Sequence, residues 1–338
     1  MKIPKATQLP SGSWRTRVRI DGKDITITRN TEEETVAEAM ALKAGLQEAK
    51  NKAPKDMTLR EAMDEYITMR EPVLSPATIR GYITIRNNRL QTVMDRTINK
   101  TTDKMYQQAI NADIKKCAPK TMKNAWGLIS TVLEDVAGRK VECALPQVVS
   151  SERLFLEPEE ILVFIDSVAG HKDEIPILVE LHGLRISELL NLTWKDIDTK
   201  KKTITVHGSA VPDKDNNLVH KESNKTSASR RVVPILIPQL LEAVEKADKT
   251  TKYVYTHGSS TLYGSINRVC RKNGLPLVGN HGCRHSFASL CYSLKIPEQM
   301  TQKLGGWQDA GTMRKIYTHL ASRDIQKHLG ALADFFSK

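Results

Sequence analysis

Polar and apolar residues alternate strictly near the start of the chain. Residues 14–20 have the sequence WRTRVRI. Because successive side chains of a β-strand point to opposite faces, this stretch predicts a strand with one mixed apolar face and one arginine face. Asp21-Gly22 predicts a tight hairpin turn, and residues 23–29 (KDITITR) predict the partner strand. The arginine face consists of Arg15, Arg17 and Arg19.

A helix is expected to follow this hairpin. Thr31 and Glu34 have the spacing of a capping box, and the segment after them is rich in helix-forming residues. Residues 50–56 (KNKAPKD) indicate a linker. The arginine face could be an ordinary solvated surface, but strict alternation of three guanidinium groups favours a sheet that binds a nucleic-acid groove.

Residues 57 to about 145 show the periodicity of helices. Thr58 with Glu61 predicts a second capping box, and Ser75 followed by Pro76 predicts an N-cap and the first helical residue. A further helix is predicted from Ala118-Pro119. The expected inward-facing residues are Leu59, Ala62, Met63, Tyr66, Ile67, Thr78, Ile79, Tyr82, Ile85, Met122, Trp126, Ile129 and Leu133.

Basic residues recur on the outer faces of these helices. The candidates for contact with a polyanion are Arg80, Arg86, Lys120 and Lys123. Basic helix faces are usually just solvated. Because they recur in one small bundle, contact with DNA explains them as well as simple solvation does.

Residues 138–151 lack periodicity and predict a second linker. Beyond it the pattern mixes helices with two short strands, residues 202–208 and 229–235, and the polar residues 211–224 between them indicate a loop. The whole chain is thus expected to be an α+β multidomain protein. It would combine a small three-stranded N-terminal sheet plus helix, a helical bundle, and a mainly helical domain with a small antiparallel sheet.

Composition narrows the possible functions. The chain has 338 residues and a formal net charge of +12, which favours a polyanionic partner; on charge alone, a basic soluble protein without such a partner is an equal alternative. Its five cysteines form no CxxC pair, so neither a disulfide framework nor a zinc site is expected. The N-terminal residues have no apolar signal-peptide core and no run is long enough to span a membrane, so we expect a soluble intracellular protein.

Residues suited to phosphoryl transfer lie along the third segment. Two arginines can bind the non-bridging oxygens of a phosphodiester and stay charged. An imidazole can take the proton of an attacking phenol, and a lysine can protonate the leaving 5′ oxygen, so no metal is required. Each residue alone has a structural explanation, as a surface pair, a solvated lysine or a packing aromatic. The candidates are Arg185, Lys225, His281, Arg284, Trp307 and Tyr317, with Glu188 placed to hold Arg185.

The order of these motifs resembles the tyrosine recombinases, most of all the integrases of phages and conjugative transposons. The matching stretches are LHGLRISELLNLTW, KTSASRRVVPI, HGCRHSFASL, LGGW and IYTHL. The resemblance implies an arm-type DNA-binding domain at residues 1–55, a core-binding domain at 56–147, and a catalytic domain with a C-terminal helical tail at 152–338.

The same resemblance assigns the roles. Tyr317 would form a 3′-phosphotyrosine, Arg185 and Arg284 would hold the phosphate, Lys225 would act as general acid and His281 as base. Trp307 would position the phosphate, with Glu188 and His285 in support. It implies no cofactor, and a homotetramer on double-stranded DNA with core-type and arm-type sites that exchanges strands through a Holliday junction. It also implies an excisionase, a host DNA-bending protein and a place in the bacterial cytoplasm at the nucleoid.

Two features depart from the family pattern. The motif before the nucleophile usually ends in Leu-Gly-His, whereas this chain has Leu304-Gly305-Gly306-Trp307. The stretch around Lys225 is long and also contains Lys221. Lys225 is preferred because Lys-Thr followed by Ser-x-Arg-Arg-x-Val-Pro fits the family.

Other functions remain as alternatives at this stage. A type IB topoisomerase would cut and religate a single strand with similar chemistry. A DNA-binding protein with an inactive site, or a basic metabolic enzyme, would form no covalent adduct.

The C-terminal tail has an apolar helical stripe that could pack on its own domain or, as in the family, on a neighbouring protomer. The stripe comprises Ile325, Leu329, Leu332 and Phe336.

Overall fold

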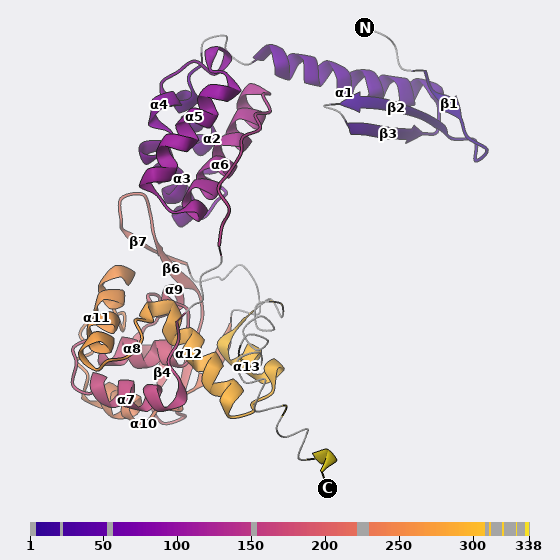
Figure 1. The fold of residues 1–338 in the computed structure, drawn as a ribbon. Helices are drawn as coiled ribbons and strands as arrows, with labels where there is room; N and C mark the ends of the chain where they lie inside the picture. Colours follow the sequence, from indigo (N-terminus) through magenta and orange to yellow (C-terminus); the bar gives the residue numbers. More distant parts are fainter. Residues whose placement is uncertain are drawn as a thin grey trace. The chain divides into compact units, whose positions relative to one another are not determined.

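The computed structural model of the chain divides into two units, residues 1–149 and 150–338, which we describe separately. It describes residues 5–20, 23–52, 57–149, 154–221 and 230–307, together with 311, 320, 329 and 335–337. Figure 1 shows the elements of both units. In these ranges, no helix is both long enough and apolar enough to cross a membrane.

The N-terminal part of the first unit is a three-stranded antiparallel sheet covered by one helix. Its order is β1-β2-β3, with strands β1 (Thr7–Gln8), β2 (Trp14–Ile20) and β3 (Lys23–Arg29), and the helix is α1 (Glu32–Lys52). The predicted alternation of buried and exposed side chains along β2 is confirmed. Val18 is buried with Ile27 and Ala39 between the sheet and the helix, whereas Arg15 and Arg17 are exposed. The predicted turn at Asp21-Gly22 lies outside the described residues.

The predicted linker at residues 50–56 is wrong in its first three residues, which are the last turn of α1. The sequence LQEAKNK consists mostly of good helix formers, and this propensity carries the helix past the expected end. Residues 53–56 lie outside the described ranges.

The rest of the first unit is a helical bundle with its own core. The capping box at its start is confirmed: the Glu61 main-chain N–H donates to Thr58 Oγ1 at 3.2 Å, and the Thr58 N–H donates to Glu61 Oε2 at 2.8 Å. Ser75 caps the next helix ahead of Pro76, also as predicted. The elements are α2 (Leu59–Arg70), α3 (Pro76–Asn88), α4 (Gln91–Met94), η1 (Ile98–Lys100), α5 (Asp103–Asp113), η2 (Ile114–Lys116) and α6 (Pro119–Ala137).

The predicted apolar faces form the centre of this bundle. Leu59, Met63, Met122 and Ile129 are completely buried, and Trp126 packs against Tyr106 with ring centroids 5.8 Å apart. Three of the residues expected inside on α3 are only half-buried, namely Thr78, Tyr82 and Ile85.

The second unit is mainly helical, with two small antiparallel sheets. One sheet has the order β4-β5-β8 and the other pairs β6 with β7. Its helices are α7 (Pro158–Val168), α8 (Glu174–Leu181), α9 (Ile186–Leu189), η3 (Trp194–Asp196), α10 (Pro238–Lys246), α11 (Ser259–Lys272), α12 (Gly279–Ser293) and α13 (Glu298–Gly305). Its strands are β4 (Ile197–Asp198), β5 (Thr203–Val206), β6 (Ser209–Pro212), β7 (Leu218–Lys221) and β8 (Arg231–Pro234).

The predicted loop at residues 211–224 is wrong in part, because β6 and β7 form a hairpin there. The polar residues are its turn: Asp213 Oδ1 accepts the main-chain N–H groups of Asp215 and Asn217 at 2.9 and 2.8 Å, and Asn216 has a φ of +67°. The strands are only four residues long, too short for the alternation to stand out in the sequence. The rest of the predicted fold class is confirmed, including the antiparallel pairing of β5 with β8.

Helix α8 lies at the centre of the second unit. It is apolar on nearly every side, and Ile177, Leu178 and Val179 are fully buried. His182, at its C-terminal end, accepts the Leu236 N–H through Nε2 at 2.9 Å, while its Nδ1 lies 2.7 Å from the Leu178 carbonyl. These contacts tie the C-terminal end of α8 to the segment after β8.

Candidate active site

A buried carboxylate holds a cluster of charged side chains in the second unit. Glu188 is the third residue of the short helix α9, and its side chain is only 3% exposed. Its Oε2 accepts the main-chain N–H of Arg185 at 2.9 Å and its Oε1 accepts Nη1 of Arg185 at 2.8 Å. Arg185 is therefore the N-cap of this helix, and the expected pairing of Glu188 with Arg185 is confirmed.

A second guanidinium, which sequence reasoning missed, pairs with the same carboxylate. Arg231 on β8 donates from Nη1 to Glu188 Oε1 at 3.1 Å and from Nη2 to Glu188 Oε2 at 2.9 Å. Burial alone would raise the pKa of Glu188, but the hydrogen bonds and charge of Arg231, helped by Arg185, hold it below its ordinary value. Glu188 therefore stays ionised at neutral pH.

Arg284 on α12 is the most buried of the three arginines, at 2% exposure. Its Nη1 donates to the carbonyls of Gly183 and Gly305, and its guanidinium carbon lies 3.9 Å from the centre of the Trp307 ring. Burial, with a smaller contribution from the charge of Arg185, lowers the pKa of Arg284 to about 9, so the group remains charged at neutral pH. Its Nη2 has no hydrogen-bond partner within the described residues.

The three guanidinium groups meet at one turn. Leu304 O accepts from Arg231 Nε at 2.9 Å, Gly305 O from Arg284 Nη1 at 2.6 Å, and Gly306 O from Arg185 Nη2 at 2.7 Å. These carbonyls lie at the C-terminal end of α13, where a helix exposes acceptors and favours positive charge.

Both glycines of this turn are needed for its geometry. Gly306 has a φ of +67°, and a Cβ there would lie 2.6 Å from Arg231 Nη1. A Cβ on Gly305 would lie 1.8 Å from Cζ3 of Trp307. The sequence Leu-Gly-Gly-Trp thus allows the backbone to approach the arginines while the indole closes over Arg284.

Trp307 is buried at 8% exposure and packs with Phe287, Ala288 and Cys291. The structure therefore brings together four of the predicted residues, Arg185, Glu188, Arg284 and Trp307. Lys225 and Tyr317 lie outside the described residues.

Two histidines share helix α12 with Arg284. His281 is exposed in the first turn, and His285 is buried one turn later. Their rings meet edge to face, with centroids 4.7 Å apart. His281 thus lies on the accessible part of the helix and His285 on the packed part.

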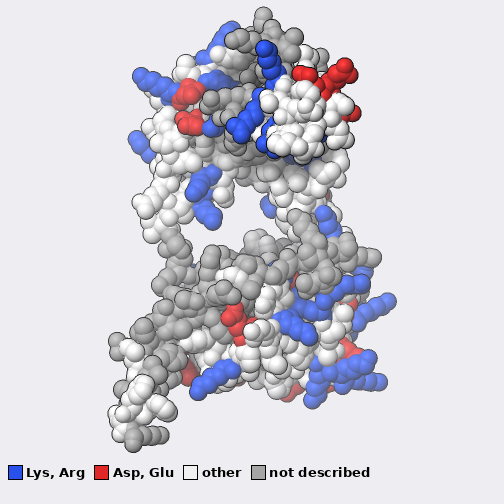
Figure 2. Space-filling view, turned by 90° about the vertical axis from the view of Figure 1, so that its right-hand side faces the viewer, with Lys and Arg blue, Asp and Glu red and all other residues white. Residues whose placement is uncertain are grey.

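The predicted DNA-contact residues lie in the first unit. Arg15 and Arg17 are exposed on β2, and Arg19 lies on the same strand. Lys120 and Lys123 line a groove of about 750 Å³ between α2, α3 and α6. Figure 2 shows Lys and Arg side chains spread over the visible face of each unit.

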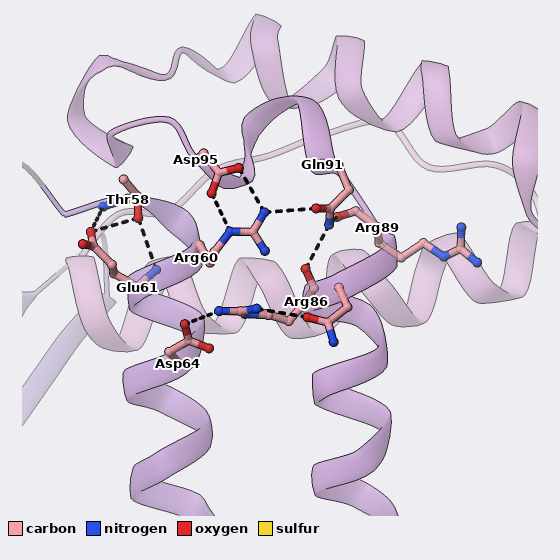
Figure 3. Close-up of polar contacts among 9 residues, drawn as sticks. Thr58, Arg60, Glu61, Asp64, Arg86, Arg89, Gln91 and Asp95 are labelled. Carbon is pink, nitrogen blue, oxygen red and sulfur yellow. Dashed lines mark hydrogen bonds and ion pairs between the residues drawn. The ribbon is translucent and has the colours of Figure 1, made fainter. Parts of the chain in front are cut away.

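Arg86 differs from these exposed lysines. Its Nη2 pairs with Asp64 Oδ2 at 2.5 Å, and its Nη1 donates to Asn87 Oδ1 at 3.1 Å, as Figure 3 shows for the Asp64 pair. The carboxylate offsets its charge, and the pair links α3 to α2. Arg80, on the same helix, is half-buried.

Comparison with known proteins identifies the class of this site. Residues 156–323 match the phage integrase family. A XerC-like tyrosine recombinase of Caldanaerobacter subterraneus is 28% identical over 208 residues, covering 53% of either chain. The integrase of Salmonella phage P22 is 25% identical over 199 residues, covering 57% of this chain and 50% of the relative. Residues 156–323 therefore belong to the phage integrase family, and the chain is similar to tyrosine recombinases of the integrase type; it spans about half the length of these curated relatives.

A solved structure shares the fold over most of the chain. The Tn1549 transposon integrase, determined in complex with transposon right end DNA, superposes with a TM-score of 0.65 at 17% identity. The match covers 82% of this chain and 100% of that one. The similarity of fold therefore extends beyond residues 150–338 into the first unit.

Proposed function

We propose that this chain is a site-specific DNA recombinase that integrates and excises a mobile element. It would cleave and rejoin DNA through a 3′-phosphotyrosine and a Holliday junction. The observation that carries the proposal is the state of Arg284: a charged, buried guanidinium whose Nη2 lacks a partner within the described residues. A buried donor of this kind costs free energy unless an acceptor arrives, and a phosphate oxygen is such an acceptor.

The chemistry assigned to the site balances without a metal. The Tyr317 oxygen attacks phosphorus while His281 takes its proton, and the bond to the 5′ oxygen breaks as Lys225 supplies a proton to it. Arg185 and Arg284 bind the non-bridging oxygens, whose charge grows in the transition state. The 5′ hydroxyl of a second duplex then reverses these steps and releases the tyrosine.

The same proposal assigns the first unit to DNA binding. Residues 1–55 would bind arm-type sites through the arginine face of β2, and residues 56–147 would bind core-type sites through the groove that holds Lys120 and Lys123. Residues 152–338 would carry the reaction. By the family resemblance, the chain would act as a homotetramer on double-stranded DNA in the bacterial cytoplasm, with an excisionase and a DNA-bending protein as further partners. The Tn1549 integrase, solved in complex with DNA, supports the DNA partner.

Strand exchange between two labelled duplexes tests the proposal. The duplexes carry the attachment sequence taken from the DNA that flanks the gene. We expect recombinant products from the wild type and none from Tyr317→Phe, which should still bind the duplex. Relaxation of supercoiled DNA without any exchange would instead show a topoisomerase, and binding without a covalent adduct would show an inactive DNA-binding protein.

A further inference from the structure

The three arginines around Glu188 differ in how their donors are used. Every nitrogen of the Arg231 guanidinium donates to a protein oxygen, and its side chain is 7% exposed. Arg284 has an Nη2 without a partner in the described part of the chain, and the Arg185 side chain is 34% exposed. Among the described arginines of this cluster, Arg284 has a whole nitrogen without a partner and Arg185 is the most exposed, so these two are the better placed to bind a substrate.

We propose that Arg231 is a positioning residue for DNA cleavage, an inference that rests on the proposed function. It fixes the Glu188 carboxylate and the turn at residues 304–307 at the same time. Through these two contacts it sets the positions of Arg185, Arg284 and Trp307, while it does not touch the phosphate itself.

The contact with Glu188 has fork geometry. Each carboxylate oxygen accepts from a different nitrogen of Arg231, and this pairing fixes the plane of the carboxylate as well as its distance. Glu188 in turn holds both the main chain and the guanidinium of Arg185. Without Arg231, the carboxylate would be free to turn toward Arg185, and its full charge would offset that of the phosphate-binding guanidinium.

The second contact of Arg231 is with the turn at residues 304–307. Arg231 Nε holds the Leu304 carbonyl at 2.9 Å, and the absence of a side chain at Gly306 leaves room for the guanidinium. The next residue after Gly306, Trp307, stacks against Arg284. A shift of this turn therefore moves the carbonyls that orient Arg185 and Arg284, together with the indole that covers Arg284.

The neighbouring Arg230 provides a matched control. It is exposed, so Arg230→Ala and Arg231→Ala remove the same charge from adjacent positions, but only the second removes a buried contact. We expect the rate of adduct formation on a suicide duplex to fall by about 100-fold in Arg231→Ala, because displaced catalytic groups lose rate steeply. Affinity for the uncleaved duplex should equal that of Arg230→Ala. Adduct formation at the rate of Arg230→Ala would overturn the proposal.

Arg231→Lys separates positioning from charge and from folding. Lysine keeps the charge but not the fork, so we expect it to cleave more slowly than Arg230→Ala while it binds DNA equally well. If Arg231→Ala does not fold, this variant carries the comparison. A lysine variant with the activity of Arg230→Ala would also contradict the proposal.

A second readout does not depend on cleavage. In protein labelled with ¹⁵N at its tryptophan indoles, Trp307→Phe identifies the Trp307 signal. That signal should shift in Arg231→Lys and stay unchanged in Arg230→Ala. An unchanged signal would refute the positioning role. A wild type that forms no adduct would defeat the proposed function, while the indole signal would still decide whether Arg231 positions the turn.

Discussion

Replacing the central carboxylate by an amide, Glu188→Gln, tests whether this network holds the second unit together. The change keeps the size of the side chain but removes the charge that two guanidiniums share. One of them, Arg231, is almost fully buried, and leaving a buried charge unpaired typically costs about 3–5 kcal/mol. In a unit of this size, each kcal/mol lowers Tm by about 2–4 °C, so we expect a decrease of about 6–20 °C.

Differential scanning calorimetry of the full chain measures this change. Glu245→Gln, an exposed position on α10 of the same unit, is the control and should melt like the wild type. The difference in Tm between Glu188→Gln and the control should also depend on pH. The folded-state pKa of Glu188 is lowered, so its stabilisation is present above the ordinary carboxyl pKa and is lost as pH falls through the folded value. Equal Tm values for both variants at pH 7 would refute this account of the network.

Three further predictions follow from the same structure. Gly306→Ala should lower Tm and the rate of adduct formation more than Gly274→Ala. Both glycines have a φ of +67°, a left-handed backbone that costs a residue with a side chain about 1–2 kcal/mol, but only at Gly306 would a Cβ meet a buried guanidinium. Burial lowers the pKa of His182 from 6.5 to about 4, so the neutral imidazole stabilises the fold more as pH rises. In urea titrations, the free energy of unfolding of the wild type minus that of His182→Gln should grow by about 3 kcal/mol between pH 4 and 6.5. A difference independent of pH would contradict this. Arg15→Ala combined with Arg17→Ala should weaken binding to arm sites, measured by fluorescence anisotropy, and the binding constant should depend less on salt concentration. An equal loss of cleavage on a minimal core duplex would refute the domain assignment.

Local signals in the sequence predicted the elements well. The capping box at Thr58 and the Ser75-Pro76 start are interactions between residues a few positions apart, so the sequence contains everything they need. The order of the family motifs likewise predicted that Arg185, Glu188, Arg284 and Trp307 come together.

Contacts between distant residues were harder to predict. Arg231 follows another arginine in a basic stretch and has the local pattern of a solvated residue. Its burial depends on a carboxylate 43 residues earlier and a carbonyl 73 residues later. The stacking of Trp307 on Arg284 likewise exists only after the turn at residues 304–307 has closed on the arginines.

The most direct test of the account is to trap the covalent intermediate and find the residue that carries it. A suicide duplex with the element's attachment sequence, which loses its 5′ hydroxyl fragment on cleavage, should leave the full chain linked to a 3′ phosphate. Mass spectrometry of the digested adduct should locate the nucleotide on Tyr317, and Tyr317→Phe should bind the duplex without forming the adduct. A nucleotide on any other residue, or an adduct that persists in Tyr317→Phe, would contradict the account.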